Sequence, residues 1–397
     1  MTLFQRHPVE APLSDVSFSG TGPAHQGPGQ KLHGHVNPDA ATGFDMSPEI
    51  SLLPRVLVGT LNTSITPMEK LSEALGIELL VKRDDHTSLG PAGGNKVRKI
   101  QYALGHALSC GADTIITAGG IQSNHCVQTA DACNQLGVEC HVISSNPIPD
   151  DLVGNAFFTK EHYGATLHGQ TPENENLSRE ERMEKLKAKL IEQGKKPYII
   201  PVGASNGIGS TGFALAMFEL QEQLRATRRE VDTIILATSS GGTQAGMLVG
   251  KQMANFPGRI IGVSVDNPED GAFERTLLDI ATECATYIGD SRVNLDQLQR
   301  DIHVHYGALG PYAVLREEEV GTISFVTHHG GPLLDPVYTV RGFRGLQQLV
   351  DDGTIAPGER VLFWHTGGNG SWEAYRSRYR EILDSVADDA VKSITQT

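Results

Sequence analysis

The chain alternates between short apolar runs and longer stretches in which apolar residues recur at helical spacing. Short runs rich in β-branched residues predict buried strands, whereas recurrence every three to four positions predicts amphipathic helices. The predicted strands are Glu78–Lys82, Thr114–Thr117, Glu139–Ile143, Tyr198–Val202, Thr233–Ala237, Ile260–Val265 and Arg360–Trp364. The predicted helices include Val97–Leu108, Cys126–Leu136, Phe213–Leu224 and Gln244–Met253.

This alternation predicts an α/β fold in which parallel sheets are covered by helices on both faces. Ligands of such folds collect at the carboxyl ends of the strands. Residues 1–48 differ, because they are rich in Gly, Pro, His and Ser and have no apolar periodicity. They predict an N-terminal extension that is disordered or wraps a neighbouring subunit. The polar stretch Thr171–Lys196 predicts a solvated surface helix.

Length and composition narrow the class of protein. A chain of 397 residues is long enough for two domains, and a net charge of −14 disfavours a nucleic-acid or anionic-membrane surface. No apolar run approaches ~18 residues and no signal peptide is evident, so no membrane span is expected. The five cysteines form no CxxC pair, which predicts reduced thiols, a cytoplasmic location and no metal site.

A glycine-rich turn, Gly93-Gly94-Asn95, leads into a predicted helix that begins with Lys96 and has Lys99 one turn later. A lysine with little side chain around it can condense with an aldehyde and form a Schiff base. The same residues also suit a helix with a solvated basic face, so this turn alone leaves both interpretations open.

A second turn follows Thr114–Thr117 and contains Gln122, Ser123, Asn124 and His125 before the next helix. Backbone N–H groups and the helix dipole attract an anion at such a place, for example a substrate carboxylate. Ser or Asn also caps helices without further function, but a cap needs only one such residue. The cluster therefore favours a binding function.

A third turn, Ser240-Gly241-Gly242-Thr243, follows Thr233–Ala237. Small residues let the backbone close around a phosphate, and hydroxyl groups add donors beside the helix start. The Lys-Ser/Thr pair of a nucleotide P-loop is missing, so a monophosphate fits better than a triphosphate.

One motif points elsewhere. Gly207-Ile-Gly-Ser-Thr-Gly212 matches the dinucleotide fingerprint, which also expects an acidic residue at the end of the next strand. Asp232 precedes that strand instead, so nicotinamide binding is not expected.

Polar side chains also occur on later loops. Tyr312 and Tyr338 suit acid–base work or ring stacking, although tyrosines on loops are also ordinary rim residues. Thr366 follows the last predicted strand, where its hydroxyl could bind a heterocycle nitrogen or satisfy a turn.

Taken together, these turns resemble one family, the pyridoxal-phosphate enzymes of fold type II that include D-cysteine desulfhydrase and 1-aminocyclopropane-1-carboxylate deaminase. The resemblance runs from about Arg55 to the region of Tyr375. Its markers are Lys82-Arg-Asp-Asp85, Gly93-Gly-Asn-Lys96 with Lys99, Gln122-Ser-Asn-His125, Ser240-Gly-Gly-Thr-Gln-Ala-Gly246, Leu334-Asp-Pro-Val-Tyr338 and His365-Thr-Gly-Gly368.

The resemblance implies a tryptophan-synthase-β-like architecture of two open twisted parallel sheets, with pyridoxal 5'-phosphate as cofactor in a homodimer. A large domain would comprise residues 49–96 and 205–397, and a small domain residues 97–204. Closure of the cleft between them would exclude water.

The resemblance also implies roles for single residues. Lys96 would form the Schiff base and Asn95 would contact the ring hydroxyl. The phosphate would be held by Lys99, Ser240, Gly241, Gly242 and Thr243. The substrate carboxylate would be bound by Ser123 and Asn124, with Gln122 and His125 beside them. Tyr312 and Tyr338 would flank substrate and ring, with Thr339 and Thr366 near the pyridine nitrogen; Lys96, Ser123, Tyr312 and Tyr338 are the expected catalytic residues.

One position discriminates within the family, because the deaminase branch carries a glutamate where this chain has Thr339. A carboxylate there would keep the ring nitrogen protonated, whereas a hydroxyl suffices to expel a good leaving group. This favours a β-eliminating lyase that releases thiol, sulfide or sulfite, ammonia and an α-keto acid such as pyruvate. His86, Val97 and Val340-Arg341 depart from the usual pattern and leave the substrate side chain open.

Three alternatives remain. The chain could be a ring-opening 1-aminocyclopropane-1-carboxylate deaminase or an L-cysteate sulfo-lyase. It could also be a protein that binds pyridoxal phosphate or a metabolite without turnover.

Overall fold

The structure is a computed structural model that describes residues 47–395 apart from 89 and 92. The predicted N-terminal extension therefore lies outside the described residues except for its last two positions, where helix α1 (Pro48–Ser51) begins. Among the described residues, none of the helices combines the length and the apolar character that a membrane span requires.

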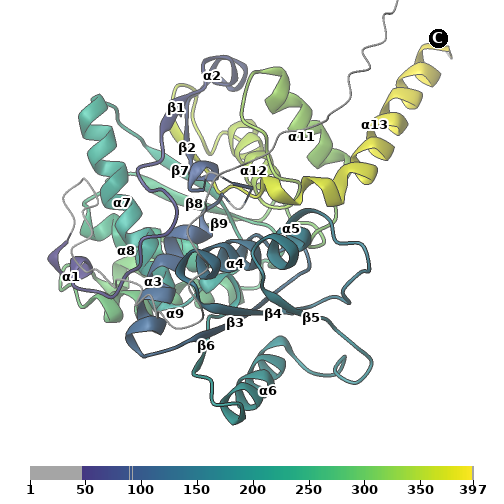
Figure 1. Ribbon diagram of the computed structural model, residues 1–397. Coiled ribbons are helices and arrows are strands. Elements are labelled where there is room, and N and C mark those ends of the chain that lie inside the picture. Colours follow the sequence, from purple (N-terminus) through teal and green to yellow (C-terminus); the bar gives the residue numbers. More distant parts are fainter. Residues whose placement is uncertain (1–46, 89, 92, 396–397) are drawn as a thin grey trace, which may run out of the picture. The chain divides into compact units, whose positions relative to one another are not determined.

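Two sheets form the framework (Figure 1). The larger has the order β1-β2-β10-β7-β8-β9, and the smaller has the order β5-β4-β3-β6. Only the pair β1–β2 is antiparallel among these strands. The larger sheet consists of β1 (Ile65–Pro67), β2 (Glu78–Arg83), β7 (Thr233–Thr238), β8 (Arg259–Ser264), β9 (His303–His305) and β10 (Arg360–His365). The smaller consists of β3 (Thr114–Gly119), β4 (Glu139–Ser144), β5 (Thr166–His168) and β6 (Pro197–Ile199).

Each face of the larger sheet has its own hydrophobic core, because successive side chains of a strand point to opposite faces. In β7, Ile234 and Leu236 pack against one group of helices, and Ile235 and Ala237 pack against another. The first group is α7 (Gly207–Thr227), α8 (Gly242–Met253) and α9 (Ala272–Ile288). The second is α2 (Glu69–Leu75), α11 (Glu317–His328), α12 (Thr339–Asp351) and α13 (Trp372–Thr395).

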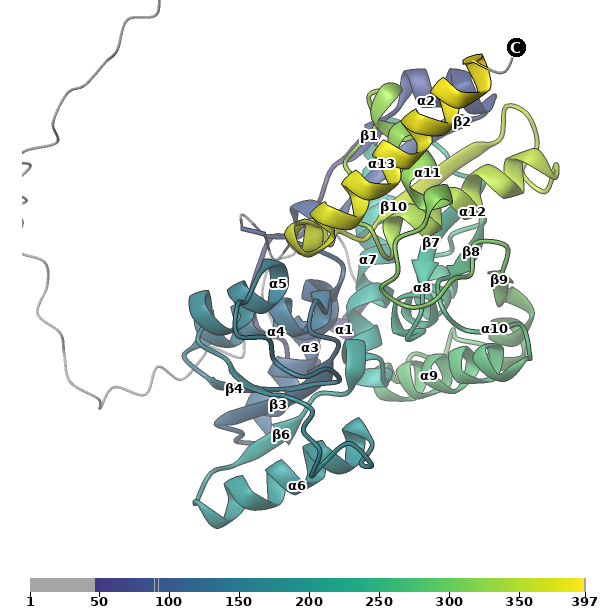
Figure 2. The same cartoon turned by 90° about the vertical axis from the view of Figure 1, so that its right-hand side faces the viewer.

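The smaller sheet is covered in the same way (Figure 2). Ile115 of β3 packs with α3 (Lys96–Ser109) and α4 (Asn124–Leu136), whereas Ile116 packs with α6 (Arg179–Glu192) on the other face. A capping box between Ser178 and Glu181 starts α6. The shorter helical elements are Asp84–His86, α5 (Gly154–Phe157), Phe158–His162, Val202–Ala204, α10 (Leu295–Asp301) and Asn369–Ser371.

The predicted α/β class with helices on both faces is confirmed, and each predicted strand and helix has a counterpart. One predicted strand is shorter than expected. Tyr198–Val202 forms a strand only to Ile199, because Pro201 has no N–H to donate and the chain then turns. The strands of the smaller sheet fall within residues 97–204, while the division into two domains stays a prediction.

The dinucleotide-like motif has a packing role at the start of α7. A Cβ on Gly209 would lie 2.1 Å from the carbonyl oxygen of Ala204, and one on Gly212 would lie 2.0 Å from that of Arg98. These glycines let α7 approach the backbone of its neighbours closely.

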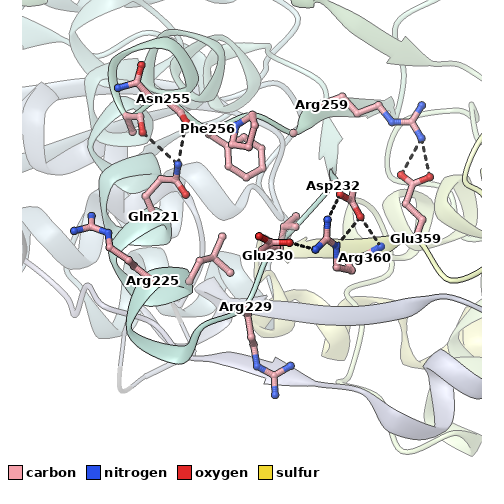
Figure 3. Close-up of a pocket in the computed structure, with 15 residues that line it drawn as sticks. Gln221, Arg225, Arg229, Glu230, Asp232, Asn255, Phe256, Arg259, Glu359 and Arg360 are labelled. Atoms are coloured by element: carbon pink, nitrogen blue, oxygen red, sulfur yellow. Dashed lines mark hydrogen bonds and ion pairs between the residues drawn. The ribbon is translucent and has the colours of Figure 1, made fainter.

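Asp232 is likewise engaged elsewhere. It accepts a hydrogen bond of 2.8 Å from Nε of Arg360, at a groove of about 1100 Å³ near the amino ends of β7, β8 and β10 (Figure 3). Glu230 also pairs with Arg360, and Glu359 pairs with Arg259. The carboxylates of this groove are therefore neutralised within it.

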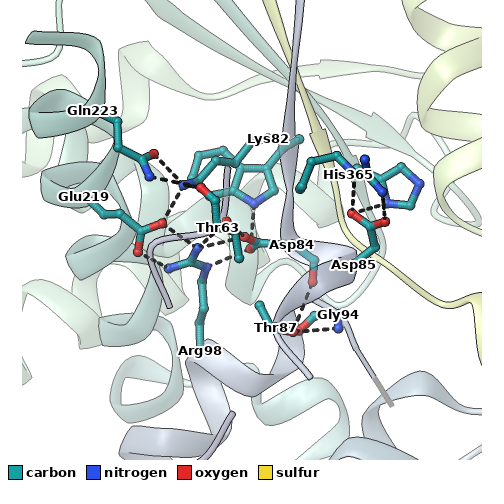
Figure 4. A network of polar contacts seen from close by, with 12 residues as sticks. Thr63, Lys82, Asp84, Asp85, Thr87, Gly94, Arg98, Glu219, Gln223 and His365 are labelled. Carbon is teal, nitrogen blue, oxygen red and sulfur yellow. Dashed lines mark hydrogen bonds and ion pairs between the residues drawn. The ribbon is translucent and has the colours of Figure 1, made fainter. Parts of the chain in front are cut away.

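A buried charge network joins the elements around the start of α3 (Figure 4). Arg98 donates to Asp84 at 2.7 Å and to Glu219 at 2.8 Å, and Lys82 donates to Glu219 at 2.5 Å. Trp364 Nε1 donates to Asp84 at 2.7 Å. All four charged side chains are almost fully buried. Two cations and two carboxylates thereby link β2, α3, α7 and β10.

Glu219→Gln should strongly destabilise the fold. The change leaves two buried cations with one carboxylate, and breaking such a pair costs about 3–5 kcal/mol of unfolding free energy at pH 7. Denaturant unfolding measures the loss. Glu373→Gln is the matched control, because Glu373 pairs with Arg376 on the exposed side of α13 and should change stability little.

The loss should also depend on pH. Burial alone would raise the pKa of Glu219, but Arg98 and Lys82 outweigh it and lower the pKa to about 2. Because the folded pKa lies below the ordinary 4.5, the charge stabilises the fold above pH 4.5, and this stability disappears as pH falls towards 2. The difference in unfolding free energy between wild type and Glu219→Gln should therefore become smaller at low pH. A difference that does not change with pH would contradict this account.

Candidate active site

A pocket of about 580 Å³ lies where the carboxyl ends of β3, β4, β7, β8 and β10 meet. Most of the predicted site residues line it: Asn95, Lys96, Ser123, Asn124, His125, Ser240, Gly241, Thr243, Tyr312, Tyr338 and Thr366. The predicted residues outside the lining are Lys99, Gln122, Gly242 and Thr339.

Lys96 is the first residue of α3, and the turn before it rests on the end of β10. The N–H of Asn95 donates to the carbonyl of Thr366 at 3.0 Å, and a Cβ on Gly94 would lie 2.9 Å from that oxygen. Lys96 Nζ donates to Asn95 Oδ1 at 3.1 Å and lies 5.9 Å from the centre of the Tyr338 ring.

The amine of Lys96 is unusually easy to deprotonate. Burial lowers its pKa from 10.5 to about 8, although the charge of Asp335 acts in the opposite direction. The fraction of molecules in which this amine is neutral near pH 7 is therefore far larger than for an ordinary lysine. A neutral amine is the form that attacks an aldehyde.

Lys99 lies behind the pocket wall and reaches it through hydroxyl groups. Its Nζ donates to Ser205 Oγ at 3.1 Å, and Ser205 Oγ lies 2.8 Å from Ser240 Oγ. Burial, and then the charge of Lys96, place the pKa of Lys99 well below its usual value. Among the ion pairs of the described residues none involves Lys99, so an anion at Ser240 would supply the missing countercharge.

The turn after β7 has the conformation of an anion site. Gly241 has φ 81°, which favours glycine, and α8 begins at the next residue with its amino end beside the pocket. Gly242 lies behind the turn, where a Cβ would come 2.6 Å from Ser205 Oγ. Asn95 Nδ2 donates to Thr243 Oγ1 at 2.9 Å, which ties this turn to the one that carries Lys96.

The turn at the start of α4 is fixed by its own hydrogen bonds. Ser123 caps the helix, since its Oγ accepts from the N–H of Cys126 at 3.3 Å, and it also lines the pocket. Asn124 Oδ1 accepts from Asn155 Nδ2 at 2.8 Å. The side chain of Gln122 accepts from Asn155 N at 2.9 Å and donates to the carbonyl of Val153, so it braces the α5 segment and lies outside the pocket lining.

His125 presents a free acceptor. Thr117 Oγ1 donates to the carbonyl of Ile200 at 2.9 Å, so it must accept from His125 Nε2 at 2.7 Å. His125 Nδ1 then carries no proton, and this buried atom has no partner within the described structure. Burial, followed by the charges of Lys99 and Lys96, puts the pKa of His125 well below its ordinary value, so the ring is neutral.

Tyr312 and Tyr338 form a pair across the pocket. Their hydroxyl oxygens are 2.8 Å apart, and the rings meet at 65° with centres 6.1 Å apart. Burial raises the pKa of both phenols, most strongly that of Tyr338. The pair therefore stays protonated at neutral pH.

The two threonines expected near the pyridine nitrogen are separated. Thr339 is fully buried, where its Oγ1 donates to Asp335 Oδ1 at 2.7 Å and accepts from Asp335 N at 2.6 Å. This hydroxyl is consumed by the turn that starts α12. Of the two threonines, Thr366 lines the pocket and Thr339 does not.

The pocket also has walls that the sequence reasoning missed. Arg179 and Glu180 come from the start of α6, where only a solvated helix was expected. Asp266 and Asn267 follow β8, and the rule that ligands collect at the carboxyl ends of strands could have found them. Gly119, Gly120, Thr238 and Ser239 lie in the two turns predicted after β3 and β7, and the other missed residues are Ser145, Asn146, Val202, Gly203 and Ala237.

The family described as "Pyridoxal-phosphate dependent enzyme" matches residues 56–367. The chain belongs to this family. The predicted family and its cofactor, pyridoxal phosphate, are therefore confirmed.

Several relatives of this pyridoxal-phosphate enzyme carry more specific names. A putative 1-aminocyclopropane-1-carboxylate deaminase of Pyrococcus furiosus is 35% identical over 80% of this chain and 93% of its own length. A mitochondrial bifunctional D-cysteine desulfhydrase/1-aminocyclopropane-1-carboxylate deaminase of Arabidopsis thaliana is 37% identical over 74% of this chain and 73% of its own. The D-cysteine desulfhydrase of Serratia proteamaculans is 33% identical over 84% and 99%.

Solved structures agree with this placement. The crystal structure of an "ACC deaminase homologue" covers 85% of this chain and 100% of its own, with 32% identity and a TM-score of 0.72. A pyridoxal-phosphate-dependent aspartate racemase, at 18% identity and a TM-score of 0.54, shares the fold.

The pocket of this pyridoxal-phosphate enzyme fits the cofactor. Lys96 offers an amine for the aldehyde, and the turn from Ser240 to Thr243 offers N–H and hydroxyl donors for the phosphate. Thr238 Oγ1 and His125 Nδ1 are buried polar atoms without partners among the described residues. Lys99 places a buried amine behind the phosphate turn, and a bound anion would favour its protonated form.

The pKa of Lys96 can be tested during reconstitution. When cofactor-free protein is mixed with pyridoxal phosphate, the rate of covalent attachment should rise with pH through a midpoint near 8, because only the neutral amine reacts. Absorbance kinetics measure the rate, and borohydride reduction with peptide mapping locates the attachment. Lys96→Arg keeps the charge and should show no attachment; a midpoint near 10 would contradict the buried amine.

Proposed function

We propose that this enzyme is a lyase that eliminates the β-substituent of a small amino acid of the D-cysteine type. The products would be sulfide or another β-leaving group, ammonia and an α-keto acid such as pyruvate. The observation that carries the proposal is that, of the two threonines expected near the ring nitrogen, the pocket offers the hydroxyl of Thr366, while residue 339 is a threonine where the family resemblance gives the deaminase branch a carboxylate. The fully buried position of Thr339, held by Asp335, leaves Thr366 as the neutral candidate for the ring nitrogen.

The cofactor, when bound, supplies an aldehyde for the substrate amine and a ring that accepts negative charge from the α-carbon. Ser123 and Asn124 would hold the substrate carboxylate at the amino end of α4, where the helix dipole favours an anion. The unprotonated Nδ1 of His125 has no proton to give a carboxylate, so we assign it to accepting a hydrogen bond from a donor group of the substrate or the cofactor.

The proton transfers are assigned to Lys96 and the tyrosine pair. Lys96 Nζ, with a pKa of about 8, is suited to remove the α-proton near neutral pH. The phenols of Tyr338 and Tyr312 stay protonated and are linked by a 2.8 Å hydrogen bond, so a proton lost by one can be replaced from the other. We assign them to protonating or orienting the leaving group.

We also propose a cytoplasmic homodimer with a large domain of residues 49–96 and 205–397 and a small domain of residues 97–204. Free thiols at Cys110, Cys126, Cys133, Cys140 and Cys284 support a reducing compartment. Sedimentation analysis would test the oligomeric state.

The substrate can be identified with a panel of amino acids. The holoprotein should release pyruvate and sulfide from D-cysteine faster than from L-cysteine or serine, and Lys96→Arg should abolish release. The names of the relatives favour a second candidate, ring opening of 1-aminocyclopropane-1-carboxylate, which α-ketobutyrate as main product would reveal. Sulfite from L-cysteate would instead identify a sulfo-lyase. Yellow but inert protein would identify a binding protein.

Tyr338→Phe should slow elimination without loss of the cofactor. Removing a general acid typically lowers the rate by ~10²–10⁴-fold, so kcat should fall while the cofactor absorbance stays unchanged. Tyr379→Phe is the control, because Tyr379 packs on Trp372 away from the pocket. A wild-type kcat in Tyr338→Phe would assign the proton transfer elsewhere.

A further inference from the structure

Arg341 is a fully buried arginine whose five N–H groups all have acceptors. Nη1 donates to the carbonyls of Val265 and Gly310, both at 3.0 Å. Nη2 donates to the carbonyls of Pro311 at 2.9 Å and Val314 at 2.8 Å. Nε donates to Glu319 Oε1 at 3.1 Å.

Four of these five bonds hold backbone beside the pocket. Gly310, Pro311 and Val314 belong to the loop that carries Tyr312. Val265 immediately precedes Asp266 of the pocket wall. Arg341 itself lies in the first turn of α12, three residues after Tyr338. One guanidinium therefore connects three parts of the pocket wall: the loop that carries Tyr312, the start of α12 next to Tyr338, and the segment that leads to Asp266.

Core packing holds the ends of this loop, where Ala308 and Leu315 are buried, but its middle is more exposed. As whole residues Tyr312 is 41% exposed and Val314 45%, and the Tyr312 ring packs on that of Tyr338. Pro311 has no N–H, and Ala313 adopts φ 59°, which is unfavourable for a residue with a Cβ. The bonds from Arg341 to Pro311 and Val314 lie on either side of this strained residue.

The charge of Arg341 is already balanced by protein. Glu319 is fully buried, pairs with both Arg341 and Arg316, and has a lowered pKa: burial would raise it, but Arg316 and Arg341 outweigh that effect. With its countercharge and all donors in use, Arg341 is built to hold backbone rather than to bind an anion.

We propose that Arg341 is a positioning residue that sets Tyr312 against Tyr338 and so keeps their hydroxyl groups within hydrogen-bond reach. The catalytic part of this inference rests on the proposed function, in which the tyrosine pair acts on the leaving group. Lysine at this position keeps the charge but offers three donors on a compact ammonium, too few for the five acceptors.

The test compares Arg341→Lys with Tyr312→Phe and with the double variant, using D-cysteine as substrate. In Arg341→Lys, kcat should fall by roughly tenfold to a hundredfold, because displacing a reacting group by about 1 Å costs this much. KM should change less. If Arg341 acts through Tyr312, the double variant should be no slower than Tyr312→Phe alone. Additive losses, or a wild-type kcat in Arg341→Lys, would overturn the proposal.

Hydrogen exchange of the cofactor-free protein gives a readout that needs no turnover. Peptides covering residues 306–316 should exchange faster in Arg341→Lys than in wild type, while peptides of the sheets stay protected. Arg316→Lys is the matched control, because Arg316 shares Glu319 but has no bond to the loop carbonyls among the described contacts. Unchanged exchange in Arg341→Lys would overturn the proposal.

A second variant covers the case in which Arg341→Lys does not fold. In Gly310→Ala, the new Cβ would lie 3.0 Å from Arg341 Nη2 and 2.8 Å from Arg316 Cζ, so it crowds both guanidinium groups without removing a charge. It should also speed exchange of the loop, and unchanged exchange would count against the proposal. Failure of wild type to release pyruvate from D-cysteine would refute the proposed function alone, because the exchange result stands without it.

Discussion

The start of α3 is fixed by a buried set of charges that is stable only when complete. Arg98 lies two residues after Lys96 and binds Asp84 of the β2 end and Glu219 of α7. Desolvating four charged groups is costly, and their mutual attraction offsets the cost only if each has its partners in good geometry. A shift of α3 along its axis would leave an unpaired charge in the core. This constraint holds Lys96 in place, and Trp364 extends it to β10 and thus to Thr366.

Three lysines near the start of α3 differ in whether a carboxylate balances their charge. Lys82 has a carboxylate partner, and it belongs to the structural network. Lys99 is as deeply buried and Lys96 is partly exposed to the pocket, yet among the described ion pairs neither has a carboxylate, and desolvation lowers the pKa of both. Burying an amine without a countercharge costs free energy. An aldehyde bound to Lys96 and an anion bound near Lys99 would offset this cost. The network thus provides the rigidity that lets two unpaired lysines persist beside it.

Local pattern was enough to predict the longer strands, the main helices around them and the turns that carry Lys96, Ser123 and Ser240 at the pocket. Each predicted turn follows a parallel strand, and the carboxyl ends of parallel strands meet at one edge, so local signals converge in space. What failed depends on contacts between distant segments. The hydroxyl of Thr339 binds Asp335, Gln122 turns to Asn155, and the start of α6 reaches the pocket with Arg179.

The glycine motif at the start of α7 is the opposite case: its local pattern indicates a ligand site, but contacts between distant segments explain it. Its spacing is that of a nucleotide site, yet Gly209 and Gly212 are needed because backbone oxygens of Ala204 and Arg98 lie where a Cβ would stand. Spacing along a chain records where glycine is required, but not whether a ligand or a neighbouring helix occupies the space. Only the fold distinguishes these two causes.

Most groups that face the reacting centre are neutral, and this bears on the chemistry. His125 is uncharged, the two tyrosines are protonated and Thr366 is a hydroxyl, whereas the charged lining residues Arg179, Glu180 and Asp266 come from the start of α6 and the end of β8. A ring nitrogen beside a hydroxyl withdraws electrons less strongly than one held protonated by a carboxylate. Expelling a stable thiolate requires less electron withdrawal by the ring than breaking a carbon–carbon bond does. The hydroxyl of Thr366 at the pocket therefore agrees with the proposed elimination, and desolvation, which lowers the pKa of Lys96, suits this amine to its proposed role as base.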